Sequence, residues 1–228
     1  MRRRAPQRHA RQMGSCDSYS KEIVMKQQNN STTKQQRKSL MLKDLVLIGI
    51  FAVIYLVIIM ACDCMGIVPI MYLIYPTIAA IIAGPLVLLF MAKEQKMFAF
   101  AIFGIIPPAL TFLLGNTYVV LVIVIITTLL AEVLRKIGNY SSFTWNTLAY
   151  AVYSLWIPGV LSQMIFVRER FLELCKPMGD AYIAQLVQIL TWQSMILVTI
   201  GSIVGAIIGA LIGKKLLKKH FVKAGIVA

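Results

Sequence analysis

The stretch Asp44-LVLIGIFAVIYLVIIMACDCM-Gly66 decides the fold of this chain. It contains no charged residue between Asp44 and Asp63, and most of its side chains are aliphatic or aromatic. An α-helix rises ~1.5 Å per residue, so ~20 apolar residues cross the ~30 Å hydrocarbon core of a bilayer. The stretch therefore predicts a helix that spans a membrane.

Five further apolar stretches follow, each close to the length that a membrane crossing needs. They run from Ile70 to Ala92, Met97 to Leu114, Tyr118 to Leu134, Phe143 to Val167 and Trp192 to Leu217. The chain is 59% hydrophobic and 14% charged, and a water-soluble core of 228 residues cannot accommodate that composition. We expect an all-α integral membrane protein in which residues 41–228 form a domain of six transmembrane helices.

If the chain crosses the membrane six times, its basic residues are divided unevenly between the two sides of the membrane. Most of them precede Asp44, lie between the second and third or the fourth and fifth stretches, or follow Gly213. Only Arg168, Arg170 and Lys176 lie on the other side. Loops rich in Lys and Arg stay on the cytoplasmic side of a membrane. Both termini are therefore predicted to be cytoplasmic, in a multi-pass protein of the cell membrane.

The net charge of +14 comes from the tails and the inner loops. In a soluble protein it would suggest nucleic-acid binding, but here it follows membrane orientation and favours anionic lipid, so no nucleic-acid partner is expected. Residues 1–40 are basic and polar and lack an apolar run, which predicts a disordered cytoplasmic tail. Because Met41 supplies a second start with a basic flank, we expect this tail to be dispensable or not native.

The sixth stretch carries glycine at every fourth position, at Gly201, Gly205, Gly209 and Gly213. This spacing leaves one ridge of the helix without side chains, so another helix can approach it closely. We expect the ridge to pack inside the monomer rather than to form a dimer. The prolines of the second and third stretches are interpreted as ordinary kinks, with a break that lines a ligand site as the alternative.

Polar and aromatic residues gather near the predicted outer ends of the helices. They include Asp63, Asn116, Tyr118, Tyr153, Trp156 and Gln163. In the fifth stretch, Tyr153, Trp156 and Gln163 fall on one face of a helix at 100° per residue, together with Val160. This face either contacts a planar solute or belongs to an interfacial aromatic belt, and the sequence leaves both interpretations open.

The last outer connection, residues 168–191, is longer than the others. Its apolar residues recur with a helical period, at Tyr182, Ile183, Leu186, Val187 and Leu190. They predict a short amphipathic helix over the outer mouth, which is either a lid on a pocket or a passive interfacial helix. Cys175 in this connection is also open to a disulfide bond with Cys62 or Cys64, although four cysteines are too few for a disulfide framework.

Few ionisable residues lie within the predicted membrane segments. Glu132 is within helical reach of Arg135 and Lys136, which predicts an ion pair at the inner boundary. No acidic residue lies near the predicted midplane, so a proton- or sodium-coupled transporter lacks obvious carriers. No arrangement of a nucleophile with a base, and no His-rich metal motif, is visible. The chain is not expected to be an enzyme or to hold a metal or another cofactor.

Several segments carry a family resemblance by their order and spacing. They are Leu42-Lys-Asp-Leu-Val-Leu-Ile-Gly-Ile-Phe51, Ala83-Gly84-Pro85, Leu148-Ala-Tyr-Ala-Val-Tyr-Ser-Leu-Trp156 and Ile212-Gly-Lys-Lys-Leu-Leu-Lys-Lys-His-Phe221, followed by Lys223-Ala-Gly225. With them the chain resembles the S components of energy-coupling factor (ECF) transporters, specifically the MptD-like or Trep_Strep group. The resemblance covers Met41 to Ala228.

The resemblance implies a six-helix subunit that binds a vitamin-like organic micronutrient near the outer face. Such a subunit docks onto a transmembrane coupling subunit that carries two ABC ATPase subunits. The alternative is a stand-alone secondary transporter or facilitator of a small solute. A metal solute is not expected, because the nickel- and cobalt-binding relatives have a histidine after the initiator methionine, where this chain has Arg2, or Leu42 if it begins at Met41.

The resemblance also implies where solute and partner would bind. Solute contacts in this group lie in the outer loops and upper helix ends, which correspond by region to Asp63, Asn116, Tyr118, Trp156, Gln163 and Tyr182. Docking uses a pair of small residues, four apart, near the inner half of the first helix. The candidates here are Gly49 and Ala52, which are three apart.

Overall fold

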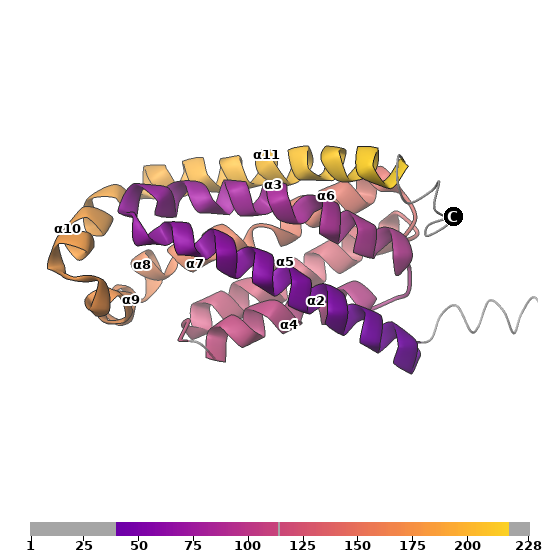
Figure 1. Ribbon diagram of the computed structural model, residues 1–228, viewed down its shortest axis with the longest axis horizontal. Coiled ribbons are helices and arrows are strands. Elements are labelled where there is room, and N and C mark those ends of the chain that lie inside the picture. The colour runs from indigo at the N-terminus through magenta and orange to yellow at the C-terminus, as the bar shows by residue number, and fades with distance from the viewer. Residues whose placement is uncertain (1–39, 114, 219–228) are drawn as a thin grey trace, which may run out of the picture. The chain divides into compact units, whose positions relative to one another are not determined.

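The structure, a computed structural model, describes residues 40–113 and 115–218, and the regular elements of this part are all helices (Figure 1). Four are long and apolar enough to cross a membrane: α2 (Leu42–Asp63, extended by the 3-10 helix η1, Cys64–Ile67), α3 (Pro69–Lys93), α5 (Tyr118–Ile137) and α11 (Trp192–Leu216). A fifth apolar helix, α4 (Ala99–Leu113), has 15 residues. The all-helical fold is confirmed, with four candidate membrane spans where six transmembrane helices were predicted. The predicted tail, residues 1–40, lies outside the described residues except for Leu40.

The predicted fifth transmembrane helix is not continuous. It is divided into α6 (Phe143–Tyr153), α7 (Trp156–Leu161) and α8 (Gln163–Phe166). Pro158 has no N–H group, so it cannot donate to the carbonyl of Ser154 four residues earlier. That carbonyl accepts instead from the N–H of Ile157 (3.1 Å) and from the hydroxyl of Ser202 in α11 (3.5 Å). Irregular backbone at membrane depth is tolerated where protein covers it, and Ser154 and Pro158 are both buried.

The last connection contains two short helices and a turn. These are α9 (Arg168–Cys175), the 3-10 turn η2 (Lys176–Met178) and α10 (Asp180–Ile189). Helix α10 corresponds to the predicted amphipathic helix, because Leu186 and Leu190 are buried while Gln185 is exposed. Cys62, Cys64 and Cys175 are free thiols, so the disulfide alternative is not realised.

Helices α3 and α11 lie side by side along their lengths, with their backbones in direct contact (Figure 1). A Cβ atom added to Gly209 would lie 2.6 Å from the carbonyl oxygen of Ile81, and one added to Gly84 would lie 2.5 Å from the carbonyl carbon of Gly209. Added Cβ atoms would also meet α3 from Gly201 and Gly205 at 2.7 Å and from Gly213 at 3.0 Å. The glycine ridge of α11 therefore lies against α3 within the same chain.

Two of the prolines inside α3 and α4, Pro85 and Pro108, leave carbonyl groups without their helical donors, and neighbouring helices cover these two groups. Pro108 leaves the carbonyl of Gly104 free, and the Tyr153 hydroxyl donates to it (3.2 Å). Pro85 likewise leaves the carbonyl of Ile81 without its helical donor, and Gly209 of α11 lies against that carbonyl. The prolines are thus accommodated inside the helix bundle.

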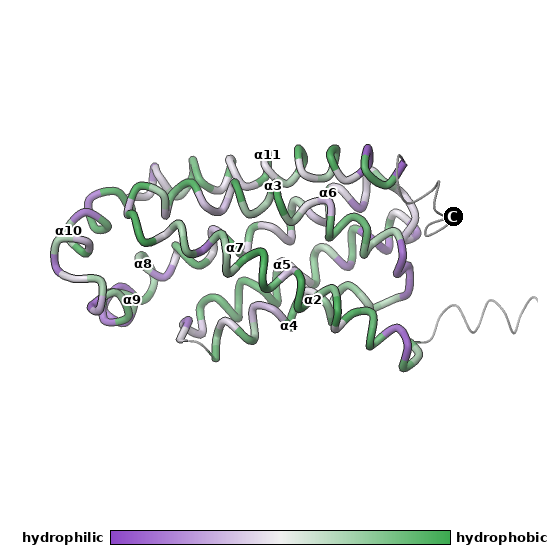
Figure 2. The backbone as a smooth tube through the Cα atoms, viewed as in Figure 1, coloured by the Kyte–Doolittle hydropathy of each residue, from purple (hydrophilic) through white to green (hydrophobic). Residues whose placement is uncertain are grey.

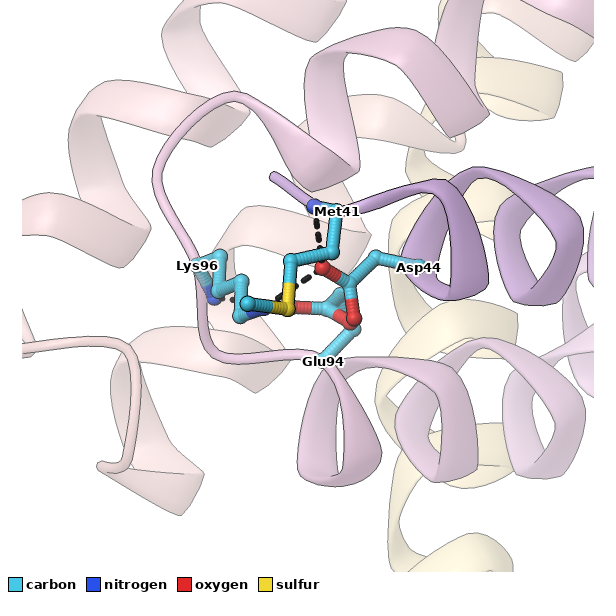
Figure 3. A network of polar contacts seen from close by, with 4 residues as sticks. All are labelled: Met41, Asp44, Glu94 and Lys96. Carbon is cyan, nitrogen blue, oxygen red and sulfur yellow. Dashed lines mark hydrogen bonds and ion pairs between the residues drawn. The ribbon is translucent and has the colours of Figure 1, made fainter. Parts of the chain in front are cut away.

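One end of the bundle, which we call the basic end, gathers the start of α2, the α3–α4 and α5–α6 turns and the end of α11. The Lys96 ammonium pairs there with the Asp44 carboxylate, which also accepts from the Met41 N–H (2.6 Å; Figure 3). At the end of α11, the Lys214 ammonium lies 4.4 Å from the centre of the Phe143 ring. These contacts bring the first and last described helices to the same end of the membrane domain.

Arg135 holds the α3–α4 turn at the basic end and is fully buried. Its guanidinium donates to the carbonyl oxygens of Met91 (3.2 Å) and Glu94 (2.8 Å), which the end of α3 leaves without helical donors. The predicted boundary ion pair was wrong within the described residues, because no ion pair joins Glu132 to Arg135 or Lys136 there. Glu132 accepts instead from the N–H of Phe98 (2.7 Å) and the hydroxyl of Tyr140 (3.3 Å).

Hydrophobic residues occupy the lengths of the helices, and hydrophilic residues concentrate at the two ends (Figure 2). The end opposite the basic end, which we call the cavity end, is formed by η1, the α4–α5 turn and the segment from α8 to α10. This distribution is the one that a bilayer imposes, since its core cannot solvate charged groups.

A pair of glycine-to-alanine substitutions tests the α3–α11 contact. Gly209→Ala is expected to lower the free energy of unfolding by about 1–3 kcal/mol, because its methyl group would overlap the α3 backbone. Gly49→Ala is the control, since a Cβ there meets no atom within 4 Å, and it should leave stability unchanged or slightly raised. Thermal unfolding in mild detergent measures both. Equal stability of the two variants would contradict the close contact.

Candidate functional site

A cavity of about 390 Å³ opens at the cavity end, between α2, α3, the α4–α5 turn and the segment from α7 to α10. Its polar lining includes Asp63, Thr111, Asn116, Gln163 and Tyr182. Its apolar walls include Met60, Tyr72, Val160 and Phe171. The volume falls within the ~300–1,000 Å³ that small-molecule sites occupy. Apolar walls with a few converging polar groups are typical of such sites.

The amide of Gln163 organises one wall of the cavity. Its Oε1 accepts from the N–H of Thr117 (2.9 Å), and its Nε2 donates to Asn116 Oδ1 (3.2 Å) and to the carbonyl of Val160 (2.9 Å). Asn116 donates in turn to the carbonyl of Thr111 (3.3 Å). Because backbone groups fix which atom of each amide donates, the network has one orientation. Gln163 thus holds the α4–α5 turn against α8, and Asn116 remains partly exposed to the cavity.

The floor of the cavity is aromatic. A smaller space of about 20 Å³, lined by Trp156 and Tyr75, shares Asp63 and Asn116 with the main cavity. The indole N–H of Trp156 donates to the hydroxyl of Tyr55 (3.0 Å), which lies about two turns before Asp63 in α2. The buried rings then continue toward the basic end through Tyr55, Tyr153, Phe103, Phe100 and Phe90. Side chains therefore fill the bundle beneath the cavity.

Helices α9 and α10 cover the cavity. The Tyr182 hydroxyl donates to the carbonyl of Gly66 (2.6 Å), which ties α10 to η1. Burial raises the pKa of Tyr182 to about 12 and also raises the pKa of the Cys175 thiol, so both groups remain protonated at neutral pH. Phe171 of α9 is buried with its ring 6.4 Å from that of Tyr72. The connection lines the cavity directly, as a lid would.

The structure brings together most of the predicted contact residues. Asp63, Asn116, Gln163 and Tyr182 line the main cavity, and Trp156 lines the small space beneath it. Tyr118 is exposed and lines a neighbouring opening together with Arg170. Tyr153 is fully buried, with its hydroxyl directed to the Gly104 carbonyl. The expectation that Tyr118 and Tyr153 belong to the same pocket is therefore corrected.

Sequence reasoning missed Tyr72, Thr111 and Phe171 as cavity residues. Tyr72 offered a signal, because only the short η1 turn separates α2 from α3 and the first turn of α3 must then lie beside Asp63. Thr111 and Phe171 gave no comparable signal. A threonine near a helix end and a phenylalanine in a charged segment both have ordinary explanations.

The two candidate docking residues on α2 have different environments. Gly49 is partly exposed with open space where a Cβ would be, whereas Ala52 is 1% exposed and packed inside the bundle. The expectation that Ala52 contacts a docking partner is therefore corrected. The exposed face of α2 at this level consists of Val46, Ile50, Val53 and Val57 around Gly49.

Comparison with protein families gives one match that covers most of the chain. The model described as hypothetical bacterial integral membrane protein (Trep_Strep) matches residues 42–223. Comparisons with curated proteins and with solved structures gave no match. The match begins at the first residue of α2 and includes every helix described above.

Replacing Gln163 tests the network that shapes the cavity wall. Gln163→Leu should lower the free energy of unfolding by about 2 kcal/mol or more, because it leaves the buried N–H of Thr117 without an acceptor. Gln185→Leu, at an exposed position of α10, is the matched control and should change stability little. Thermal unfolding in mild detergent compares the variants. A Gln163→Leu protein as stable as the control would argue against the network.

Proposed function

The chain belongs to the Trep_Strep family of bacterial integral membrane proteins, and we propose that it is the substrate-binding S component of an ECF-type ABC importer. In this proposal it captures a small organic micronutrient, vitamin-like in size, at the outer face of the plasma membrane. It passes the solute inward together with a transmembrane coupling subunit and two ABC ATPase subunits. The chain itself performs no chemical reaction and needs no cofactor.

The cavity with its closed floor is the observation that carries this proposal. Its size suits a small molecule, and its walls combine aromatic faces with amide and carboxylate groups. Beneath it, Trp156, Tyr55 and Tyr153 are each at most 1% exposed, so side chains block a path toward the basic end. A stand-alone facilitator or secondary transporter must open its own bundle alternately to the two sides of the membrane. A capture subunit requires only the binding cavity, because its partner supplies the movement.

The charge distribution supports an outward-facing cavity. The basic end carries Lys43, Lys93, Lys96, Arg135, Lys136, Lys214 and Lys215. The cavity end carries Arg168, Arg170 and Lys176, which Glu169, Glu173 and Asp180 offset. Because positively charged loops remain in the cytoplasm, the basic end is assigned to the inside and the cavity to the outside.

Helix α2 offers a surface for the coupling subunit. Because Gly49 has no side chain, the exposed face of α2 has a shallow depression between Val46, Ile50 and Val53, where another membrane helix can approach closely. This surface lies in the half of α2 nearer the basic end. A partner whose ATPases are cytoplasmic would make its contacts on that side.

Filling the cavity tests solute capture. Val160→Phe places a ring in both the main cavity and the space beneath it, and is expected to abolish retention of the bound solute. Mass spectrometry of small molecules that co-elute with the protein in mild detergent measures retention. Tyr118→Ala, outside the main cavity, should retain the solute as the wild type does. A folded Val160→Phe protein that carries the same solute would refute this use of the cavity.

Co-purification with the coupling subunit and the ATPases tests the partner assignment. Gly49→Leu should reduce recovery of the partners about tenfold, because the side chain occupies the place where a helix would approach. Ala61→Leu is the control, at an exposed position near the other end of the same helix. Solute uptake that persists after removal of the ATPases would instead identify a stand-alone facilitator or secondary transporter.

A further inference from the structure

We propose that the solute of this cavity is an organic cation, a small molecule whose protonated amine or amidine pairs with the Asp63 carboxylate. This inference rests on the proposed function, since it takes the cavity to be the solute site and names the chemical class of the solute. It follows from the charges, the hydrogen-bonding capacity and the aromatic walls that line the cavity.

The formal charge of the cavity lining is negative. Among the described residues that line it, Asp63 carries the only charge, and none is Lys, Arg or His. The neighbouring Cys175 and Tyr182 remain protonated at neutral pH and add no charge. Within the described part of the chain the Asp63 carboxylate makes no hydrogen bond and no ion pair, so both of its oxygens are available to a ligand.

Three of the remaining polar residues already donate their hydrogens within the protein. The hydroxyl hydrogens of Thr111 and Tyr182 are already donated to the carbonyls of Pro108 (2.8 Å) and Gly66 (2.6 Å), which leaves their oxygen lone pairs free. Both hydrogens of the Gln163 amide are also used. The Tyr72 hydroxyl and the second hydrogen of the Asn116 amide remain as donors in the described part of the chain. The Asp63 carboxylate, which can only accept, is therefore the group that favours a donating ligand such as a protonated amine or amidine.

The aromatic wall adds a second attraction for a cation. Tyr72 and Phe171 present rings on one side of the cavity, and Tyr75 lies beside Tyr72 with ring centres 5.3 Å apart. A cation within ~6 Å of a ring centre is attracted by the negative face of the ring. Both the ring faces and the Asp63 carboxylate would repel an anion at the same place.

Arg170 is the basic residue to weigh against this assignment. It lines the neighbouring opening with Tyr118, outside the main cavity, and it pairs with Glu173 at 3.1 Å. Both partners are exposed to solvent, where attraction for an anion is weak and screened by salt. An anionic solute is therefore an outcome for the experiment to reveal, and the lining of the main cavity disfavours it.

Three indole probes that differ only at the end of the same side chain test the charge of the solute. They are tryptamine, indole-3-propionamide and indole-3-propionate, which end in an ammonium, a neutral amide and a carboxylate. Isothermal titration of the full-length protein in mild detergent gives their affinities. We expect tryptamine to bind about tenfold or more tightly than the other two, because only tryptamine can pair with Asp63.

Two substitutions of the same chemical kind locate the effect. Asp63→Asn keeps the shape of the side chain and removes its charge, and should abolish the preference for tryptamine. Asp180→Asn, on an exposed residue of α10 outside the cavity lining, should preserve that preference. Equal or tighter binding of the carboxylate or the amide, a preference that survives Asp63→Asn, or failure of all three probes to bind would overturn the inference.

The Val160→Phe variant separates failure of this inference from failure of the proposed function. If the carboxylate or the amide binds best and Val160→Phe removes that binding, the cavity remains a solute site and only the assignment of a cation is lost. If no probe binds and no co-purified solute depends on Val160, both the inference and the proposed function fail.

Discussion

The direct contact between the backbones of α3 and α11 is the constraint on which the rest of this structure depends. Lipid supplies no hydrophobic force that drives membrane helices together, so their association relies on close packing and on polar contacts between helices. Gly84 and Gly209 allow that packing. Once fixed, α3 presents Tyr72 to the cavity at one end and the carbonyls of Met91 and Glu94 to Arg135 at the other.

Polar side chains in this bundle mostly satisfy backbone groups, and this explains why so few of them remain for a ligand. An unpaired carbonyl in a membrane interior costs several kcal/mol, so prolines are tolerated only with compensation. The hydroxyls of Tyr153 and Ser202 are directed to carbonyls that Pro108 and Pro158 leave free. Asp63 differs from these residues, because its carboxylate has an open cavity beside it and no internal partner within the described residues.

Hydropathy and charge predicted the long helices well and the irregular ones poorly. The predicted stretches around α2, α3, α5 and α11 agree with the helices to within a few residues, because membrane thickness fixes their length and composition. The prediction of a continuous fifth helix was wrong, because it assumed a uniform rotation of 100° per residue and took no account of Pro158. The same assumption placed Tyr153 on the face of Trp156 and Gln163. The predictions for Ala52 and Glu132 were wrong for another reason. The burial of a side chain and its choice of partner depend on which helices are neighbours, and the spacing of residues along one helix does not reveal the neighbours.

The aromatic floor constrains how any solute bound in this cavity could reach the cytoplasm. Rotating Trp156 alone would not open a path, because Tyr55, Tyr153 and Phe103 fill the bundle beneath it and contact one another. Separating α3 from α11 would break the glycine contact on which both ends of the domain depend. The resemblance to S components implies instead that the domain would move as a whole, and under the proposed function the solute would then leave through α9 and α10, the two helices that cover the cavity. A movement of that kind must work against the membrane, so it needs an external source of energy, and the proposed ATPase partners would supply it.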